Sequence, residues 1–212
     1  SLFAQMNNKK GSELCSERKM SMPQSFFDND SPNSPKHTFD VLDYKLNLDI
    51  RSCFITPFPR SFTGSVIVKF RIDTALSSIN LNATNTSLVV SSVGLSGVSF
   101  THTGNILNIV LNRVYNPGEV TEVLVNYSHN NVVDGAIYTG NGGFLTDAPP
   151  ESARKWLPCW DKPSDKATVD ITIKVPANAK IGSNGRLNDS TLTGDTLYYH
   201  WISRDPVATY LV

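Results

Sequence analysis

The sequence lacks an excess of charge of either sign, because its 19 basic and 19 acidic side chains balance. A nucleic-acid-binding protein normally carries a basic excess, so this class is excluded. No apolar run approaches the ~20 residues of a membrane-spanning helix, and the sequence therefore predicts no membrane span. Runs of strong helix formers are also missing, whereas Gly, Ser, Asn and Thr are abundant. This composition favours short strands and turns over helices.

Patterns of metal-binding side chains are missing as well. The candidate ligands are three cysteines and four histidines: Cys15, Cys53, Cys159, His37, His102, His129 and His200. The cysteine spacing matches neither a zinc cluster nor a disulfide framework. None of the histidines is followed by another four residues later, so the chain has no H-E-x-x-H motif. The sequence therefore predicts no metal site and no catalytic residue here, and it places only Cys53 and Cys159 in the core.

Residues 1–36 are predicted to be a flexible tail. The stretch from Asn7 to Lys19 is polar and charged, and the two prolines of Ser31–Pro35 prevent regular structure. The first residues, Ser1–Gln5, fit the remnant of a removed signal peptide, although a complete signal is not present. We therefore expect a secreted, periplasmic or cell-surface protein, with a cytoplasmic location as the open alternative.

Period-two alternation begins after His37. In Val41–Ile50 apolar residues, beginning with Leu42, alternate with polar ones, which predicts a long strand with one solvated face. Phe62–Ile72 repeats the alternation. Further strands are predicted at 77–82, 86–91, 95–101, 105–111, 120–127, 167–175, 179–184, 190–194, 197–203 and 207–212. Many short strands separated by turns predict an all-β domain over residues 37–212, with little or no helix.

One segment, residues 131–165, breaks this rhythm with glycines, prolines and aromatic residues. At its end, Ala153–Thr168 reads ARKWLPCWDKPSDKAT. This resembles the A-R-x-x-x-P-C-x-D-x-P-x-x-K-A signature in the N-terminal domain of the aminopeptidase N family, which consists of zinc metallopeptidases. Further family segments are matched, in order, by Asp170–Ile173, Ser183–Gly185 and Pro206–Val212. The resemblance covers residues 37–212 and implies an antiparallel saddle-like sheet together with a β-sandwich.

The signature segment is predicted to hold a structural network. Its candidate members are Arg154, Trp156, Pro158, Asp161, Pro163 and Lys166. Charged side chains among aromatic ones must be paired and hydrogen-bonded. We therefore expect Arg154 and Asp161, with Lys166, to pin an irregular loop, which the two prolines stiffen by fixing φ.

The resemblance implies that the whole protein is a zinc-dependent aminopeptidase, which hydrolyses peptides from the N-terminus. The zinc motif of that family and its Gly-x-Met-Glu-Asn loop are absent from this chain. Zinc is therefore expected in a catalytic domain that follows in the same polypeptide, and no cofactor is expected here. The β-domain is predicted to form a wall of the peptide cleft and a docking surface for that catalytic domain.

One substrate contact is implied for this domain. The family carries a Gln or Glu five residues before the signature Arg, where it binds the α-amine of the peptide. Here that position is Pro149, so the sequence departs from the pattern. The nearest carboxylates, Asp147 and Glu151, are the candidates, since a carboxylate pairs with an ammonium through charge-assisted hydrogen bonds. A turn residue ahead of the proline pair is the alternative interpretation of Asp147.

Two other functions stay open at this point. A secreted β-sandwich for adhesion or carbohydrate binding would expose Trp156 and Trp160 side by side, whereas a structural role buries them against the sheet. A relative that has lost catalysis would keep this domain and lack the zinc motif in the remainder of the protein. The surroundings of the two tryptophans test the first alternative, and the sequence beyond residue 212 tests the second.

Overall fold

Strands and tight turns make up the fold, and the all-β prediction is confirmed. The structure is a computed structural model that describes residues 38–94 and 97–212, which fall within one unit, His37–Val212. The predicted tail lies outside the described residues. The strands are β1 Phe39–Asp49, β2 Thr63–Ile72, β3 Leu76–Asn82, β4 Leu88–Gly94, β5 Ser99–Thr103, β6 Ile106–Tyr115, β7 Val120–His129, β8 Ile137–Gly140, β9 Gly143–Thr146, β10 Lys166–Pro176, β11 Arg186–Thr193 and β12 Thr196–Ala208. The described residues also form three 3₁₀ turns, η2 Arg51–Phe54, η3 Ala153–Lys155 and η4 Thr209–Leu211, and none of their helical segments is long and apolar enough to span a membrane.

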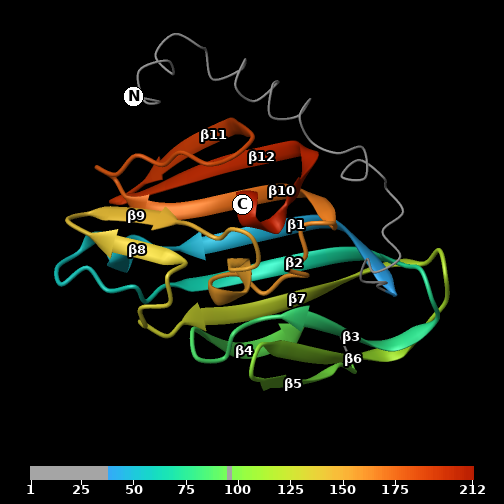
Figure 1. The fold of residues 1–212 in the computed structure, drawn as a ribbon. Coiled ribbons are helices and arrows are strands. Elements are labelled where there is room, and N and C mark those ends of the chain that lie inside the picture. The colour runs from blue at the N-terminus through green and yellow to red at the C-terminus, as the bar shows by residue number, and fades with distance from the viewer. Residues whose placement is uncertain (1–37, 95–96) are drawn as a thin grey trace, which may run out of the picture. The chain divides into compact units, whose positions relative to one another are not determined.

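The part of the chain that the structure describes forms three sheets (Figure 1). The largest has seven strands in the order β11-β12-β10-β1-β2-β7-β4, and the others are β3-β6-β5 and the hairpin β8-β9. The pairing of β1 with β10 is parallel, whereas the expectation from the sequence was an antiparallel sheet. The difference has a topological reason: β1 and β10 are joined by most of the domain, so no short hairpin turn forces them to run in opposite directions.

Alternating side chains of β1 show why the sheet has a buried face. Tyr44, Leu46 and Leu48 are at most 3% exposed, as the period-two pattern predicted. At the start of the strand the register with β2 shifts between Val41 and Asp43. This bulge puts Val41 in the core instead of Leu42, which is half-buried, because an extra residue reverses the alternation on one side. The prediction for Leu42 was therefore wrong.

Two boundaries near the C-terminus differ from the prediction. Residues 179–184 alternate between half-buried and exposed as a strand does, and Ala179 and Ile181 pack against the core. They form no strand, because no neighbouring strand pairs with them among the described residues. The two strands predicted at 197–203 and 207–212 are one strand, β12, which ends at Ala208 and continues into turn η4.

The hairpin β8–β9 lies inside the segment that was expected to be irregular. Its turn is Asn141-Gly142, with φ angles of 50° and 76°. Both values lie in the left-handed region that a two-residue hairpin turn requires, and Asn-Gly is the strongest short hairpin signal. The sequence therefore contained a hairpin signal, but the segment has several other glycines and the signal was not recognised. Figure 1 shows the hairpin and the C-terminal turn in front of one face of the large sheet.

Candidate functional site

The signature segment is organised around a buried ion pair. The Arg154 Nε atom lies 2.8 Å from Asp161 Oδ2, and the Asp161 side chain is fully buried. The same arginine donates from Nη2 to the backbone oxygen of Asp161 at 3.1 Å, and its amide donates to Oδ2 at 3.2 Å. The pair therefore closes the loop 154–161 on itself, which gives the charged groups the hydrogen bonds that burial demands.

Two partners of Asp161 come from distant parts of the chain. Thr209 Oγ1 donates to Asp161 Oδ1 at 2.8 Å, and the Asp161 amide donates to Asn82 Oδ1 at 3.0 Å. Asn82 ends β3, and Thr209 follows β12. The loop is thus tied to the smaller sheet and to the end of the large sheet. Neither residue was singled out by the sequence, because no local pattern marks a contact across 48 or 79 positions.

Lys166, which the sequence placed in this network, is exposed at the first position of β10. Among the described residues it forms no ion pair or hydrogen bond with Arg154 or Asp161. Strand alternation explains this, because the neighbouring Ala167 is buried and the lysine must face the other way. The second cation of the cluster is Lys162, whose Nζ atom lies 3.1 Å from both carboxylate oxygens of Glu151.

The two candidate substrate-binding carboxylates have different surroundings. Glu151 accepts a 2.6 Å hydrogen bond from Arg154 in addition to the two from Lys162. Hydrogen bonding by Lys162, aided by Arg154, lowers the pKa of Glu151. Asp147 directly follows β9, is exposed, and has no ion pair or side-chain hydrogen bond within the described part of the chain. Asp147 is therefore the carboxylate that is free to receive a cation.

Trp156 and Trp160 do not form an exposed platform. Trp156 is 1% exposed, and the neighbouring Pro158 is buried. Trp160 is half-buried, packs edge to face on Phe39 with ring centroids 5.4 Å apart, and its amide donates to the Tyr44 hydroxyl at 3.0 Å. Both rings pack against the sheet. This is the arrangement that marks them as structural.

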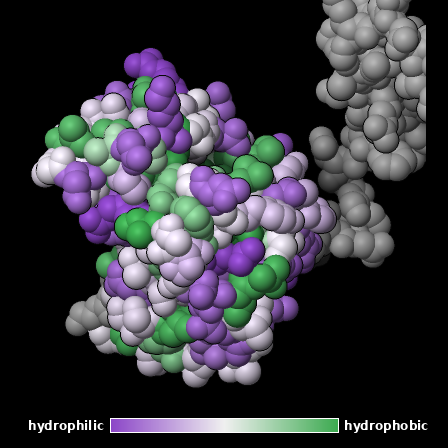
Figure 2. Space-filling view, turned by 90° about the vertical axis from the view of Figure 1, so that its left-hand side faces the viewer, coloured by the Kyte–Doolittle hydropathy of each residue, from purple (hydrophilic) through white to green (hydrophobic). Residues whose placement is uncertain are grey.

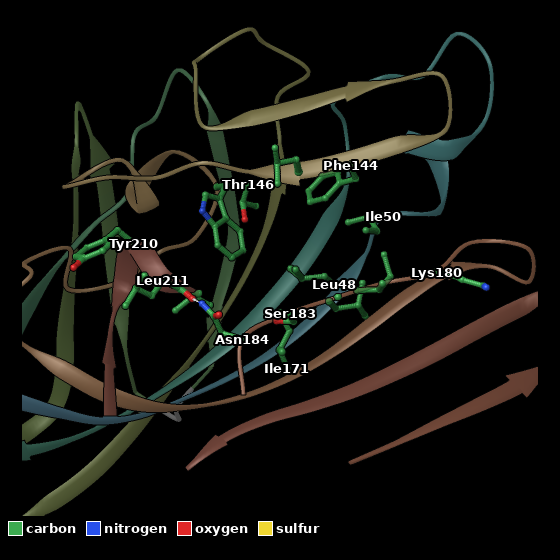
Figure 3. Close-up of a pocket in the computed structure, with 16 residues that line it drawn as sticks. Leu48, Ile50, Phe144, Thr146, Ile171, Lys180, Ser183, Asn184, Tyr210 and Leu211 are labelled. Atoms are coloured by element: carbon green, nitrogen blue, oxygen red, sulfur yellow. Dashed lines mark hydrogen bonds between the residues drawn. The ribbon is translucent and has the colours of Figure 1, made fainter. Parts of the chain in front are cut away.

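A groove with a volume of about 480 Å³, lined by both apolar and polar side chains, lies beneath β9. Its floor includes Leu48 of β1 and Ile171 of β10, and its sides include Phe144 and Leu211. Figure 3 shows Leu48, Ile171 and Phe144 around this cavity, with Thr146 at its edge. Thr146 is the residue before Asp147, so the free carboxylate lies beside the groove.

Comparison with known proteins decides what this arrangement belongs to. The sequence profile of the peptidase M1 N-terminal domain matches residues 40–211, which is most of the chain. The chain belongs to the peptidase M1 family. It is 25% identical over 196 residues to Aminopeptidase M1 of Arabidopsis thaliana, covering 80% of this chain, and 28% identical over 194 residues to Aminopeptidase M1-A of Oryza sativa, again covering 80%. In both cases it spans only 21% of the length of the relative.

Solved structures of M1 enzymes share the fold. The M1 zinc metallopeptidase from Deinococcus radiodurans superposes with a TM-score of 0.72 at 25% identity, covering 82% of this chain and 41% of that chain. A mutant two-domain M1 zinc metallopeptidase bound to L-tryptophan gives the same TM-score, identity and coverage. The resemblance to this enzyme family predicted from the signature is confirmed. The chain is the N-terminal domain of an M1 peptidase.

The M1 family is zinc-dependent, with its zinc in the catalytic domain. In residues 38–94 and 97–212 no group of three or more His, Cys, Asp or Glu side chains is placed to hold a metal ion. His129 binds Asp134, and His200 binds Asp170, each through Nε2. Cys53 and Cys159 are buried free thiols, as expected, and burial raises the pKa of Cys53 to about 11. The donor set of the described M1 domain therefore does not fit a zinc site.

The residues that lead into the hairpin β8–β9 are held by hydrogen bonds to Asp134. His129 Nε2 lies 2.9 Å from Asp134 Oδ2, and Lys155 Nζ donates to the backbone oxygen of Asp134 at 2.7 Å. Burial opposes ionisation of Asp134, but the hydrogen bonds from His129 and the Ala136 amide outweigh it and lower the pKa of that carboxyl. Asp134 therefore stays ionised and fastens the start of the hairpin to the signature segment of the M1 domain.

Proposed function

We propose that this chain is the non-catalytic N-terminal domain of a longer zinc-dependent aminopeptidase. In that enzyme it forms a wall of the peptide cleft and a docking surface for the catalytic domain of the same chain. The observation that carries the proposal is the match to the M1 N-terminal domain over residues 40–211. The buried ion pair of Arg154 and Asp161 supports it, since the signature segment that resembles the family is organised around this pair.

Asp147 is the proposed contact to the α-ammonium of the peptide. An exposed carboxylate without a partner gains a charge-assisted hydrogen bond when an ammonium binds, and the gain grows when the catalytic domain excludes water. Glu151 would gain less, because Arg154 and Lys162 already neutralise it. Pro149 stands where the family has a Gln or Glu, and in this proposal the carboxylate of Asp147, two residues earlier, takes over that contact. No observation favours the carbohydrate-binding alternative, since Trp156 is buried.

Isolated residues 37–212 are expected to bind no stoichiometric zinc and to cleave no amino-acid anilide. The full-length protein is expected to bind zinc and to cleave the anilide, because the metal and the general base belong to the catalytic domain. Elemental analysis and an anilide assay with both proteins measure this directly. Zinc-dependent turnover by residues 37–212 alone would contradict the proposal, and a full-length protein without turnover would identify a relative that has lost catalysis.

Replacing Asp147 with Asn in the full-length enzyme is expected to raise KM for amino-acid anilides about 10- to 100-fold. A hydrogen bond to a charged group contributes about 1.5–3 kcal/mol, and 1.4 kcal/mol corresponds to a factor of ten. Steady-state kinetics provide the measurement. Asp205→Asn is the matched control, since Asp205 is also exposed and lies near the C-terminal end of β12. Equal KM values for both variants would remove Asp147 from the site.

A further inference from the structure

Asp134 connects the large sheet to the hairpin β8–β9 through a buried hydrogen bond. Its Oδ2 atom lies 2.9 Å from Nε2 of His129, the last residue of β7. The His129 side chain is 0% exposed and that of Asp134 is 7% exposed. An ionised carboxylate only accepts hydrogen bonds, so the imidazole carries its proton on Nε2 and donates it. Both groups are withdrawn from water, which strengthens this hydrogen bond.

The imidazole ring of His129 is itself held by the core. It stacks on Phe62, with ring centroids 5.4 Å apart and ring planes 8° apart. The His129 amide donates to the Phe62 oxygen at 2.9 Å, and β7 lies between β2 and β4 in the seven-stranded sheet. A side chain locked by packing and hydrogen bonds keeps its partner in one place. Asp134 therefore takes its position from the sheet rather than from the loop that carries it.

A second side chain reaches Asp134 from the signature segment. Lys155, the last residue of η3, donates from Nζ to the backbone oxygen of Asp134 at 2.7 Å. The same turn carries Arg154 of the buried ion pair. Asp134 is thus held through its carboxylate by the large sheet and through its backbone by the signature segment.

One residue links Asp134 to Asp147. Asp134 Oδ1 accepts a 2.9 Å hydrogen bond from the amide of Ala136, a fully buried residue directly before β8. The oxygen of Ala136 in turn accepts from the Asp147 amide at 2.9 Å. This contact continues the β8–β9 ladder beyond the pair Ile137 and Thr146. The place of the Asp147 backbone therefore follows that of Asp134 through two consecutive hydrogen bonds.

The outer side of the hairpin faces solvent. At the end of the molecule where the β8–β9 turn lies, hydrophobic side chains occur in small groups separated by hydrophilic ones (Figure 2). Tyr138 and Leu145 of the hairpin are 50% and 62% exposed. Segments with few buried apolar contacts open locally at low cost, so the hydrogen bonds at the base of the hairpin decide how precisely Asp147 is placed.

We propose that Asp134 is a positioning residue for the contact between Asp147 and the α-ammonium of the peptide. His129 and Lys155 hold Asp134, and Asp134 fixes Asp147 through Ala136. The assignment rests on the proposed function. Misplacing an interacting group by about 1 Å can cost on the order of 100-fold in rate, so a carboxylate set by two hydrogen bonds is sensitive to the loss of either one.

The test measures KM and kcat for amino-acid anilides with the full-length enzyme. Asp134→Ala is expected to raise KM about 10-fold and to change kcat less than about 2-fold, because the reacting groups belong to the catalytic domain. In an Asp147→Asn background the same change should alter KM less than about 2-fold, since the contact that Asp134 positions is already gone. Partial unfolding gives a different result, because a smaller folded fraction lowers the apparent kcat and leaves KM unchanged.

Two further variants separate the hydrogen bonds. Asp134→Asn keeps an oxygen for the Ala136 amide, so its KM should lie between those of wild type and Asp134→Ala. Lys155→Met keeps the aliphatic stem and removes only the donor, so it carries the test if Asp134→Ala does not fold. It should raise KM about 3-fold, the effect of one lost hydrogen bond, and only when Asp147 is present.

Asp170→Ala is the matched control, because Asp170 forms a similar pair with His200 at 2.8 Å but faces away from the groove that its neighbour Ile171 lines. Its KM should equal that of wild type. An unchanged KM in Asp134→Ala and Lys155→Met, in an enzyme whose KM rises with Asp147→Asn, would overturn the positioning role and leave the proposed function intact. An unchanged KM in Asp147→Asn itself would overturn the proposed contact together with this assignment.

Discussion

Replacing Asp161 with Ala is expected to lower the free energy of unfolding by about 3–5 kcal/mol, the cost of removing one partner of a buried ion pair. The carboxylate is fully buried, and its removal leaves Arg154, whose side chain is only 16% exposed, without its main partner. Thr209 loses its acceptor at the same time. Because Thr209 ties the loop to the end of the large sheet, the loss should loosen the signature segment there, while the amide of residue 161 keeps its hydrogen bond to Asn82.

Urea denaturation of residues 37–212 measures this effect. Asp73→Ala is the matched control, because Asp73 pairs with Arg71 at 3.2 Å while both side chains are more than a third exposed. An exposed pair of this kind contributes less than about 1 kcal/mol. Asp161→Asn should fall between the two, since the amide oxygen still accepts from Thr209. A loss below about 0.5 kcal/mol for Asp161→Ala, the range of ordinary surface changes, would contradict the network.

The alternation of apolar and polar residues made most of the strands predictable, because a sheet with one buried face places apolar residues at every second position. The exceptions are places where local sequence does not decide. Leu42 and Val41 are both apolar, so only the pairing with β2 reveals the bulge. Residues 179–184 have the composition of a strand, yet a strand exists only if another strand is available to pair with it.

In the candidate site, too, some contacts could be predicted from local sequence and others depend on residues that meet only in the folded domain. Arg154 and Asp161 could be predicted as partners, because two opposite charges in an aromatic segment must neutralise each other. Lys166 was wrongly included, because it begins strand β10 and faces away from the pair, and Lys162 was missed, because it lies in an irregular loop where local sequence does not decide the direction of a side chain. Asp147 and Glu151 could not be separated either. Their difference lies in the neighbours of Glu151, and those neighbours converge only in three dimensions.

Trp156→Ala is expected to cost about 3–5 kcal/mol of unfolding free energy, the range for removing a large aromatic side chain from a core. Trp156 is among the largest fully buried side chains, and it also lines the groove with Leu48 and Ile50. Trp156→Phe should cost less than half as much. The indole Nε1 has no hydrogen-bond partner among the described residues, so phenylalanine gives up volume without breaking a hydrogen bond.

Trp201→Ala is the control for Trp156→Ala, because Trp201 is only half-buried on β12 and its removal leaves a smaller cavity. The same denaturation experiment therefore ranks Trp156→Ala first, Trp201→Ala second and Trp156→Phe lowest. A sugar-binding platform requires a different order, since a stacking tryptophan can be removed with little effect on stability. If Trp156→Ala unfolds at the wild-type urea concentration, the ring is not part of the core, and the structural role of the signature segment is wrong.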